Sequence, residues 1–175
     1  MKIINAFIVF ADLDEETELF PIRDEVYEFE GTVWELLAEV GNSDYYFVYV
    51  LDELDTLADL LHRDKTEIFS RLDPDLQDEL GSPLAIPDNA FCPFPEDDCI
   101  EFVSFSLRKA DIHLYGKFKQ LAKVSCSIES VIDIEHEEFY VKCHWHRDYK
   151  IIPKEQLEDL GSLEEFAVLL GKILE

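Results

Sequence analysis

Two stretches near the start of the chain are apolar at nearly every position. They are residues 2–10 (KIINAFIVF) and 45–51 (YYFVYVL). A strand without a polar face is buried on both sides, so this pattern predicts two strands in the middle of a sheet. Residues 25–30 (EVYEFE) alternate between charged and apolar side chains, which predicts another strand with one exposed face.

Helix signals follow these strands. Thr32 and Glu35, in TVWE, have the spacing of a capping box, which predicts a helix that begins there and continues to Val40. Apolar residues at helical spacing, together with N-cap residues, Pro74 and Gly81, predict three further helices within residues 54–61, 64–72 and 73–81. A last helix is predicted to begin at Ser162, with Glu165 completing a capping box and a buried face of Phe166, Leu169, Leu170 and Ile173.

The second half of the chain contains more strand signals than helix signals. Strands are predicted at residues 99–107, 124–134 and 138–146, the last two forming a hairpin around an acidic turn. Residues 110–123 are ambiguous, and the spacing of Leu114, Phe118 and Leu121 favours a short helix that is interrupted near Gly116.

Together these elements predict an α+β fold with a mostly antiparallel sheet and helices packed on one face. A chain of 175 residues is long enough to bury a core, so we expect a single domain over residues 1–175. Residues 82–98 contain four prolines. We interpret this segment as a long connection within the domain, the alternative being a boundary between two small lobes.

Charge adds a strong constraint on partners. The chain has 40 acidic and 15 basic residues and a formal net charge of −25 at pH 7. Residues 1–98 hold 26 acidic and 5 basic residues, whereas residues 99–175 hold 14 and 10. A small domain stays soluble with a net charge of about 2–8 in magnitude, so solubility does not account for this excess. The resulting field favours a cationic partner.

This charge argues against direct binding of nucleic acid or of an anionic membrane, because both require a basic surface. No apolar segment has the length of a transmembrane helix, and the N-terminus lacks the cleavage pattern of a signal peptide. We therefore expect a cytoplasmic protein whose four cysteines are reduced.

The stretch IVFADLDEET places two aspartates at the end of the first predicted strand. It resembles motif I of the haloacid-dehalogenase phosphatases, which implies a Rossmann-like chain with Asp12 as nucleophile and Asp14 as acid/base. That family has Thr where this chain has Glu16, and Thr17 comes one position later. We therefore interpret the stretch as an acidic loop after a core strand.

The stretch CHWH contains His144 and His146, which on a strand would point to the same face. With His113 or His136 they would form a zinc-like set, and the chain would be a metal-dependent hydrolase. In the interpretation that we adopt, both histidines are exposed to solvent, and the inward face consists of Phe139, Val141, Cys143 and Trp145. The chain contains no nucleophile elbow, Walker loop, dinucleotide fingerprint or H-E-x-x-H motif, so we expect no enzymatic activity, no cofactor and no metal.

The acidic clusters of the first half remain, and aromatic residues that suit an interface lie near them. We predict that a basic partner contacts this half. The predicted partner-binding residues are Asp12, Asp14, Glu15, Glu16, Glu18, Asp24, Glu25, Tyr27, Glu28, Asp52, Glu53, Asp55 and Asp59.

An acidic single domain without catalytic motifs resembles bacterial immunity proteins of the contact-dependent growth-inhibition and colicin type. The resemblance implies that the chain neutralises a cognate basic toxin, such as a nuclease, by occluding its active or substrate-binding surface. A sheet edge offers a second route, and the less acidic strands at 124–134 and 138–146 are the predicted candidates. The alternatives are an acidic mimic of nucleic acid that inhibits a DNA- or RNA-binding protein, and the metal-dependent hydrolase.

Overall fold

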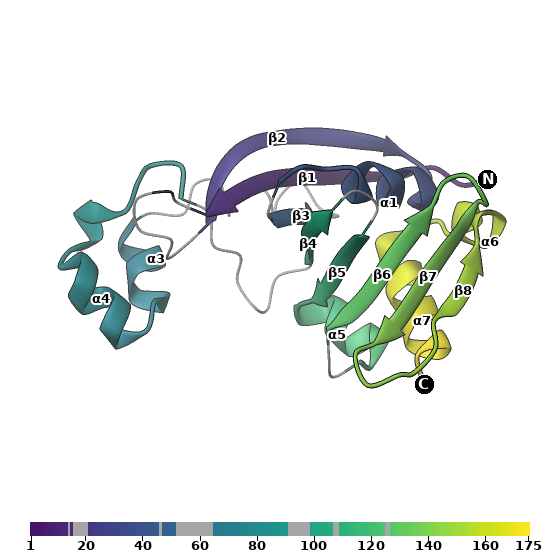
Figure 1. Cartoon of the computed structure of the whole chain (residues 1–175). Coiled ribbons are helices and arrows are strands. Elements are labelled where there is room, and N and C mark those ends of the chain that lie inside the picture. The colour runs from purple at the N-terminus through teal and green to yellow at the C-terminus, as the bar shows by residue number, and fades with distance from the viewer. Residues whose placement is uncertain are drawn as a thin grey trace.

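The centre of the molecule is an antiparallel sheet. A computed structural model describes residues 1–13, 15, 21–45, 47–51, 65–90, 99–106, 109–124 and 127–175. Eight described strands follow the order β2-β1-β3-β4-β5-β6-β7-β8 (Figure 1). They are β1 (Ile4–Leu13), β2 (Pro21–Gly31), β3 (Phe47–Leu51), β4 (Cys99–Ser106), β5 (Lys109–Leu114), β6 (Ile128–Asp133), β7 (Glu138–Cys143) and β8 (Lys150–Pro153). All their neighbouring pairs are antiparallel, which confirms the predicted sheet type.

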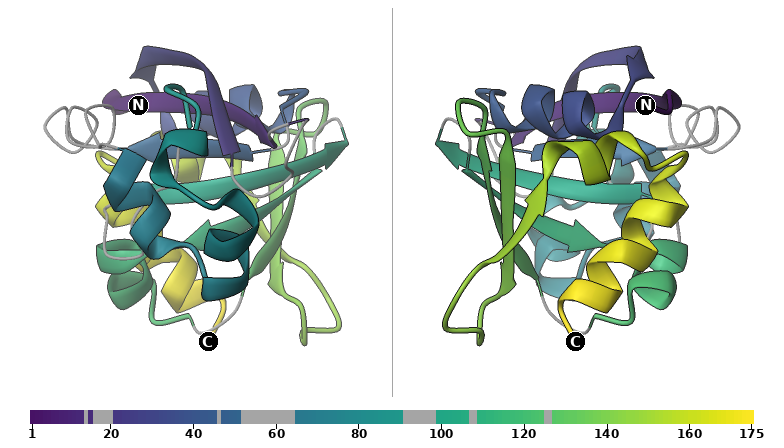
Figure 2. Two further views of the ribbon diagram at one scale, coloured as in Figure 1. Left: turned by 90° about the vertical axis from the view of Figure 1, so that its left-hand side faces the viewer. Right: turned by 90° about the vertical axis from the view of Figure 1, so that its right-hand side faces the viewer.

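The helices divide into two groups. They are α1 (Val33–Gly41), α3 (Lys65–Arg71), α4 (Pro74–Leu80), the 3₁₀ turn η1 (Pro83–Ala85), α5 (Gly116–Ala122), α6 (Lys154–Glu158) and α7 (Leu163–Ile173). Helices α1, α5, α6 and α7 share one hydrophobic core with the sheet, and α1, α6 and α7 lie over one face of it in the right-hand view of Figure 2. Helices packed on one face are therefore confirmed for this group. Helices α3 and α4 lie beyond the far end of β1 and β2 (Figure 1), around a small cluster of Ile68, Ile86 and Ala90.

Strand β1 is apolar on both faces because both faces are covered. Ile4, Ala6 and Ile8 belong to the main core, whereas Val9 and Ala11 belong to a second cluster with Tyr49 and Leu51 of β3. Strand β1 lies between β2 and β3, and β3 lies between β1 and β4. The prediction that both are interior strands is confirmed.

No helix in the described part of the chain is both long and apolar enough to cross a membrane.

The capping box predicted at the start of α1 is present. The Thr32 hydroxyl accepts from the Glu35 backbone N–H at 3.1 Å, and the Glu35 carboxylate accepts from the Thr32 N–H at 2.8 Å. At α7, Ser162 also accepts from the Glu165 N–H at 3.1 Å. The Glu165 carboxylate accepts from the Gly161 N–H instead of the Ser162 N–H, so the predicted box forms there only in part.

We expect Thr32→Ala to lower the free energy of unfolding by about 1–2 kcal/mol, since a lost N-cap costs about that much and Thr32 is 0% exposed. Ser162→Ala is the matched control, because Ser162 is only half-buried. We expect this variant to lower the free energy of unfolding by less than Thr32→Ala does. Chemical denaturation followed by circular dichroism measures both. Equal losses would show that the burial of Thr32 contributes nothing.

Residues 110–123 differ from the prediction. Their first half is strand β5, and only Gly116–Ala122 form a helix. Ile112 lies opposite Phe102 of β4 and Ile128 of β6, so pairing on both sides outweighs the local helical spacing. Strand β8 and helix α6 were also not recognised in the sequence. The helix predicted within residues 54–61 lies outside the described residues.

Candidate functional site

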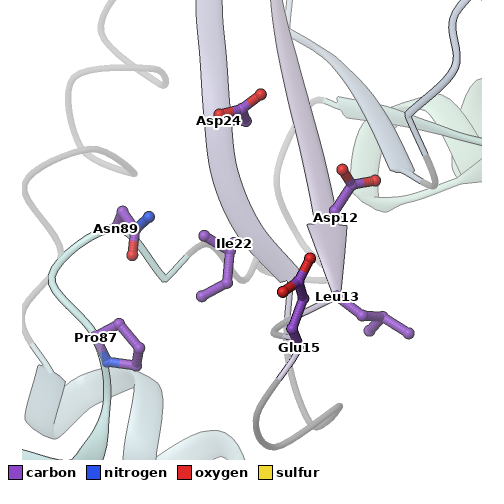
Figure 3. Close-up of a pocket in the computed structure, with 7 residues that line it drawn as sticks. All are labelled: Asp12, Leu13, Glu15, Ile22, Asp24, Pro87 and Asn89. Atoms are coloured by element: carbon purple, nitrogen blue, oxygen red, sulfur yellow. The ribbon is translucent and has the colours of Figure 1, made fainter.

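The acidic residues at the end of the β1–β2 hairpin line a hollow of about 510 Å³. We call it the acidic hollow, and its lining residues are Asp12, Leu13, Glu15, Ile22, Asp24, Pro87 and Asn89 (Figure 3). Three of these residues carry carboxylates, and no basic side chain is among the described residues that line it. The hollow therefore presents concentrated negative charge.

A break in the strand register positions these side chains. Phe10 lies opposite Glu25 whereas Ala11 lies opposite Arg23, so β2 has one extra residue, Asp24, at this point. A bulge of this kind bends a strand and changes the direction in which its side chains point. Asp12, two residues beyond Phe10, comes from the neighbouring strand at the same end of the hairpin (Figure 3).

The remaining wall comes from the segment after η1. The Arg23 backbone N–H donates to the Asn89 carbonyl oxygen at 2.9 Å, and Ile22 and Ala90 form an isolated antiparallel bridge. These backbone contacts hold Pro87 and Asn89 against the hairpin. No local pattern predicts them, because the contact joins segments that are distant in the sequence.

Aromatic rings support the acidic hollow from the core side. The Phe10 ring stacks on Tyr45 with 4.9 Å between centroids, and its centroid lies 5.5 Å from that of Tyr27. The Tyr45 hydroxyl donates to Asp24 Oδ2 at 2.5 Å, and the Tyr27 hydroxyl donates to Glu39. The Tyr45 bond fixes the Asp24 carboxylate relative to the core.

Both phenols are held in the neutral form. The hydrogen bond to Asp24 is the largest cause that raises the pKa of Tyr45 to about 12, followed by burial and by the nearby negative charges. Burial is the largest cause that raises the pKa of Tyr27, followed by its hydrogen bond to Glu39. Ionisation of either phenol would place a second negative charge beside a carboxylate.

The raised pKa of Tyr45 predicts how the stability of the protein changes at alkaline pH. A raised folded-state pKa means that the contribution of the Tyr45–Asp24 bond is present below pH 10.0, the ordinary value, and is lost as the pH rises through about 12. We expect the stability difference between the parent and Tyr45→Phe to be constant between pH 7 and 9 and to shrink above pH 10. Urea denaturation across this range measures it. A difference that does not change with pH would contradict the hydrogen bond.

The structure places six of the thirteen predicted partner-binding residues. Asp12, Glu15 and Asp24 line the acidic hollow, and Glu25 and Glu28 are exposed along β2. Tyr27 is half-buried against the core. The other seven lie outside the described residues: Asp14, Glu16, Glu18, Asp52, Glu53, Asp55 and Asp59.

The phosphatase resemblance of the first strand is not supported by the sheet. A Rossmann-like fold requires parallel neighbours at the strand that carries the nucleophile. Strand β1 pairs antiparallel with both β2 and β3. Asp12 belongs to the end of β1 itself, whereas the interpretation above placed it in a loop.

The CHWH stretch also differs from the prediction. Strand β7 ends at Cys143, so His144 and Trp145 lie in a turn, and Trp145 is 62% exposed where an inward position was predicted. Cys143 is buried, as predicted. His144 Nδ1 lies 4.0 Å from Glu129, whereas His146 Nδ1 lies 3.4 Å from the Cys143 backbone nitrogen. Within the described ranges, no three His, Cys, Asp or Glu side chains are grouped as a metal ion would require.

A second group of polar side chains lies on the face of the sheet opposite the main core. Glu101 is only 8% exposed and accepts a hydrogen bond from the Tyr115 hydroxyl. Ser127 Oγ lies 3.0 Å from His113 Nδ1. Opposite Glu101 in the register is His113, but Glu101 bonds to Tyr115 and His113 to Ser127, so the three do not form a linked acid–histidine–serine relay.

The strands predicted to offer a free edge do not offer one. Strand β6 lies between β5 and β7, and β7 lies between β6 and β8. That prediction was wrong because β5, which covers β6, lies in a segment where a helix was favoured, and β8, which covers β7, was not recognised in the sequence. The strands at the two ends of the described sheet are β2 and β8.

Comparisons with models of protein families, with curated proteins and with solved structures found no match to this chain.

Proposed function

We propose that this chain is an immunity protein, which binds a basic toxin in the cytoplasm and covers the surface that the toxin uses for an anionic substrate such as nucleic acid. The observation that carries the proposal is the acidic hollow. Asp12 of β1, Asp24 of β2 and Glu15, from the turn after β1, converge there, and no basic side chain is among the described residues of its lining.

The charge of the surrounding chain supports this proposal. With 26 acidic and 5 basic residues in residues 1–98, most carboxylates of that half have no basic side chain of the same half to pair with. Lysines and arginines of a partner would supply the missing charges. A field of this sign also raises the association rate of a basic protein by roughly 10–10³-fold.

The support beneath the acidic hollow suits rapid and specific binding. Tyr45 holds Asp24 by a hydrogen bond, and Phe10 stacks on Tyr45. A carboxylate that is already fixed loses less side-chain freedom when an arginine or lysine binds it. The bidentate geometry of arginine with a carboxylate makes arginine the preferred basic residue here.

The test is co-expression of this chain with the protein encoded next to it, followed by capture through a tag on this chain. We expect a stoichiometric basic partner that is toxic alone and harmless in the complex. A neighbour that neither binds nor kills overturns the proposal. Competition by heparin or DNA distinguishes a general mimic of nucleic acid, which would bind many basic proteins with little selectivity.

A pair of charge-matched variants tests the site. In the first, Asp12→Asn, Glu15→Gln and Asp24→Asn neutralise the hollow, while the side-chain amide introduced by Asp24→Asn keeps an oxygen that accepts from Tyr45. In the control, three exposed carboxylates of α4 are neutralised by Asp75→Asn, Asp78→Asn and Glu79→Gln.

Both variants change the net charge equally. A difference between their affinities for the partner therefore shows that the position of the carboxylates matters, and not only their number. We expect the first to weaken partner binding about tenfold or more and the control to change it about twofold at most. Surface plasmon resonance or calorimetry at physiological salt measures both. Equal effects would assign the affinity to the overall field and not to the acidic hollow.

A further inference from the structure

Strand β2 is one of the two end strands of the described sheet and runs over eleven residues, Pro21–Gly31. Among the described strands it pairs only with β1, and Figure 1 shows it above β1, as the outermost strand at the top of the view. An end strand presents backbone N–H and C=O groups that are able to pair with a further strand.

The chain already uses one end of this edge for pairing. Arg23 donates its backbone N–H to Asn89, and Ile22 bridges Ala90, so the segment at 89–90 acts as a short antiparallel neighbour. From Asp24 to Gly31, no described segment continues this pairing. The remaining length of about eight residues is enough for a strand of ordinary size.

Side chains along this length differ between the two faces of β2. Tyr27 and Phe29 pack toward the main core, whereas Glu28 and Glu30 are exposed on the other face. Residues directly opposite on paired strands interact, and like charges there are destabilising. A second copy of this chain would place its own glutamates against Glu28 and Glu30, so self-pairing is disfavoured. A strand with lysine or arginine at alternate positions fits both the charge and the spacing.

We propose that the outer edge of β2, from Asp24 to Gly31, binds an extended basic segment of the partner as an additional antiparallel strand. This inference rests on the proposed function insofar as the partner is a basic protein. The pairing specifies the sequence of that segment: basic residues opposite Glu28 and Glu30, and apolar residues opposite Tyr27 and Phe29. The backbone contacts supply affinity, and the alternating side chains supply the choice of partner.

The test uses a synthetic nine-residue peptide that alternates lysine and valine, with blocked ends. Binding to the intact protein is measured by calorimetry, and amide hydrogen exchange locates the contact. We expect slower exchange of backbone amides within residues 24–31. Binding without protection of these amides, or no binding, overturns the proposal.

N-methylated peptides separate strand pairing from charge attraction. Two isomers carry N-methyl groups at odd or at even positions, so that each loses the hydrogen bonds of one edge and keeps its charge. We expect one isomer to bind like the parent peptide and the other to bind at least about tenfold more weakly. Equal binding of both isomers and the parent peptide would show that charge alone holds the peptide, which overturns the proposal.

Matched variants of the protein place the contact on the edge. Glu28→Gln with Glu30→Gln should weaken peptide binding about tenfold, and Asp78→Asn with Glu79→Gln on α4 should leave it nearly unchanged. Equal losses overturn the proposal. Protection of residues 24–31 that grows with protein concentration without peptide would assign the edge to a second copy instead, which also overturns it.

These outcomes are independent of the co-expression test. Failure of the peptide leaves the proposed function standing if the neighbour still binds. If the peptide pairs with β2 and the neighbour neither binds nor kills, the proposed function fails while the edge remains a site for basic strands.

Discussion

Gly171→Ala is expected to lower the free energy of unfolding by about 2–4 kcal/mol. Gly171 lies in α7 where this helix meets α5, and a Cβ atom there would lie 2.0 Å from the carbonyl oxygen of Ala122. Ala122 ends α5 and is fully buried. The clash is with backbone, so no flexible side chain can move aside and the two helices must separate.

The expected loss already includes an opposing effect. Alanine is favoured over glycine within a helix by about 1 kcal/mol, so without the contact the same substitution would stabilise α7. Gly161→Ala is a suitable control, because the nearest atoms to its Cβ would be side-chain atoms that can move: Lys2 Cδ at 3.2 Å and the Glu165 carboxylate oxygens at 3.5 and 3.7 Å. We expect the free energy of unfolding of the control, measured by urea denaturation, to lie within about 1 kcal/mol of that of the parent. If Gly171→Ala were as stable as the parent, α5 and α7 could not approach as closely as described.

Helix ends illustrate what the sequence was able to predict. The capping box of α1 depends on two residues three positions apart, and Gly81 ends α4 in the left-handed conformation with a φ of 78°. Both signals act within one turn of backbone, so their outcome depends little on the rest of the chain. The two-sided apolar strands β1 and β3 were equally clear, because only an interior strand requires such a pattern.

Strand β5 and the CHWH stretch illustrate what the sequence was not able to predict. The conformation of residues 109–114 depends on β4 and β6, which pair with it on either side. Trp145 was expected to continue the alternation of β7, but pairing with β8 stops at Val141 and a turn follows Cys143. In both places the conformation is decided by pairing with neighbouring strands, which the local pattern of apolar residues does not show.

The acidic hollow has one property that the sequence predicted, its charge, and one that it did not, its shape. The abundance of carboxylates in the first half was evident from composition, and Asp12 and Asp24 were predicted to bind a partner. Their convergence depends on the bulge in β2, and the wall formed by Pro87 and Asn89 depends on a bridge to Ile22. Neither feature has a local sequence signal, so the sequence indicated the charge of the site but not its shape.

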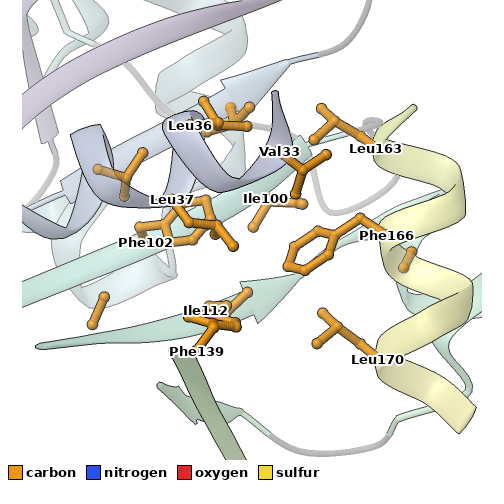
Figure 4. Packing of buried hydrophobic residues seen from close by; sticks show 14 of the residues in the cluster. Val33, Leu36, Leu37, Ile100, Phe102, Ile112, Phe139, Leu163, Phe166 and Leu170 are labelled. Atoms are coloured by element: carbon orange, nitrogen blue, oxygen red, sulfur yellow. The ribbon is translucent and has the colours of Figure 1, made fainter. Parts of the chain in front are cut away.

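Phe166→Ala should have an effect at least as large as that of Gly171→Ala, with a loss of about 3–5 kcal/mol. Phe166 is 1% exposed, and Figure 4 shows its ring pointing from α7 toward Ile100 and Ile112 of the sheet. Truncation removes the transfer free energy of the ring and leaves a cavity between helix and sheet that close packing cannot fill completely.

Leu169→Ala, on the same helix, provides the comparison, since Leu169 is only partly buried against the core. We expect this variant to lower the free energy of unfolding by about 1–2 kcal/mol. Thermal and urea denaturation measure both variants. The core around Phe166 is formed by α7 and the central strands, whereas the acidic hollow lies at the far end of β1 and β2. At temperatures where Phe166→Ala remains folded, we therefore expect unchanged partner binding. A loss of binding by the folded variant would show that the packing of α7 controls the shape of the acidic hollow.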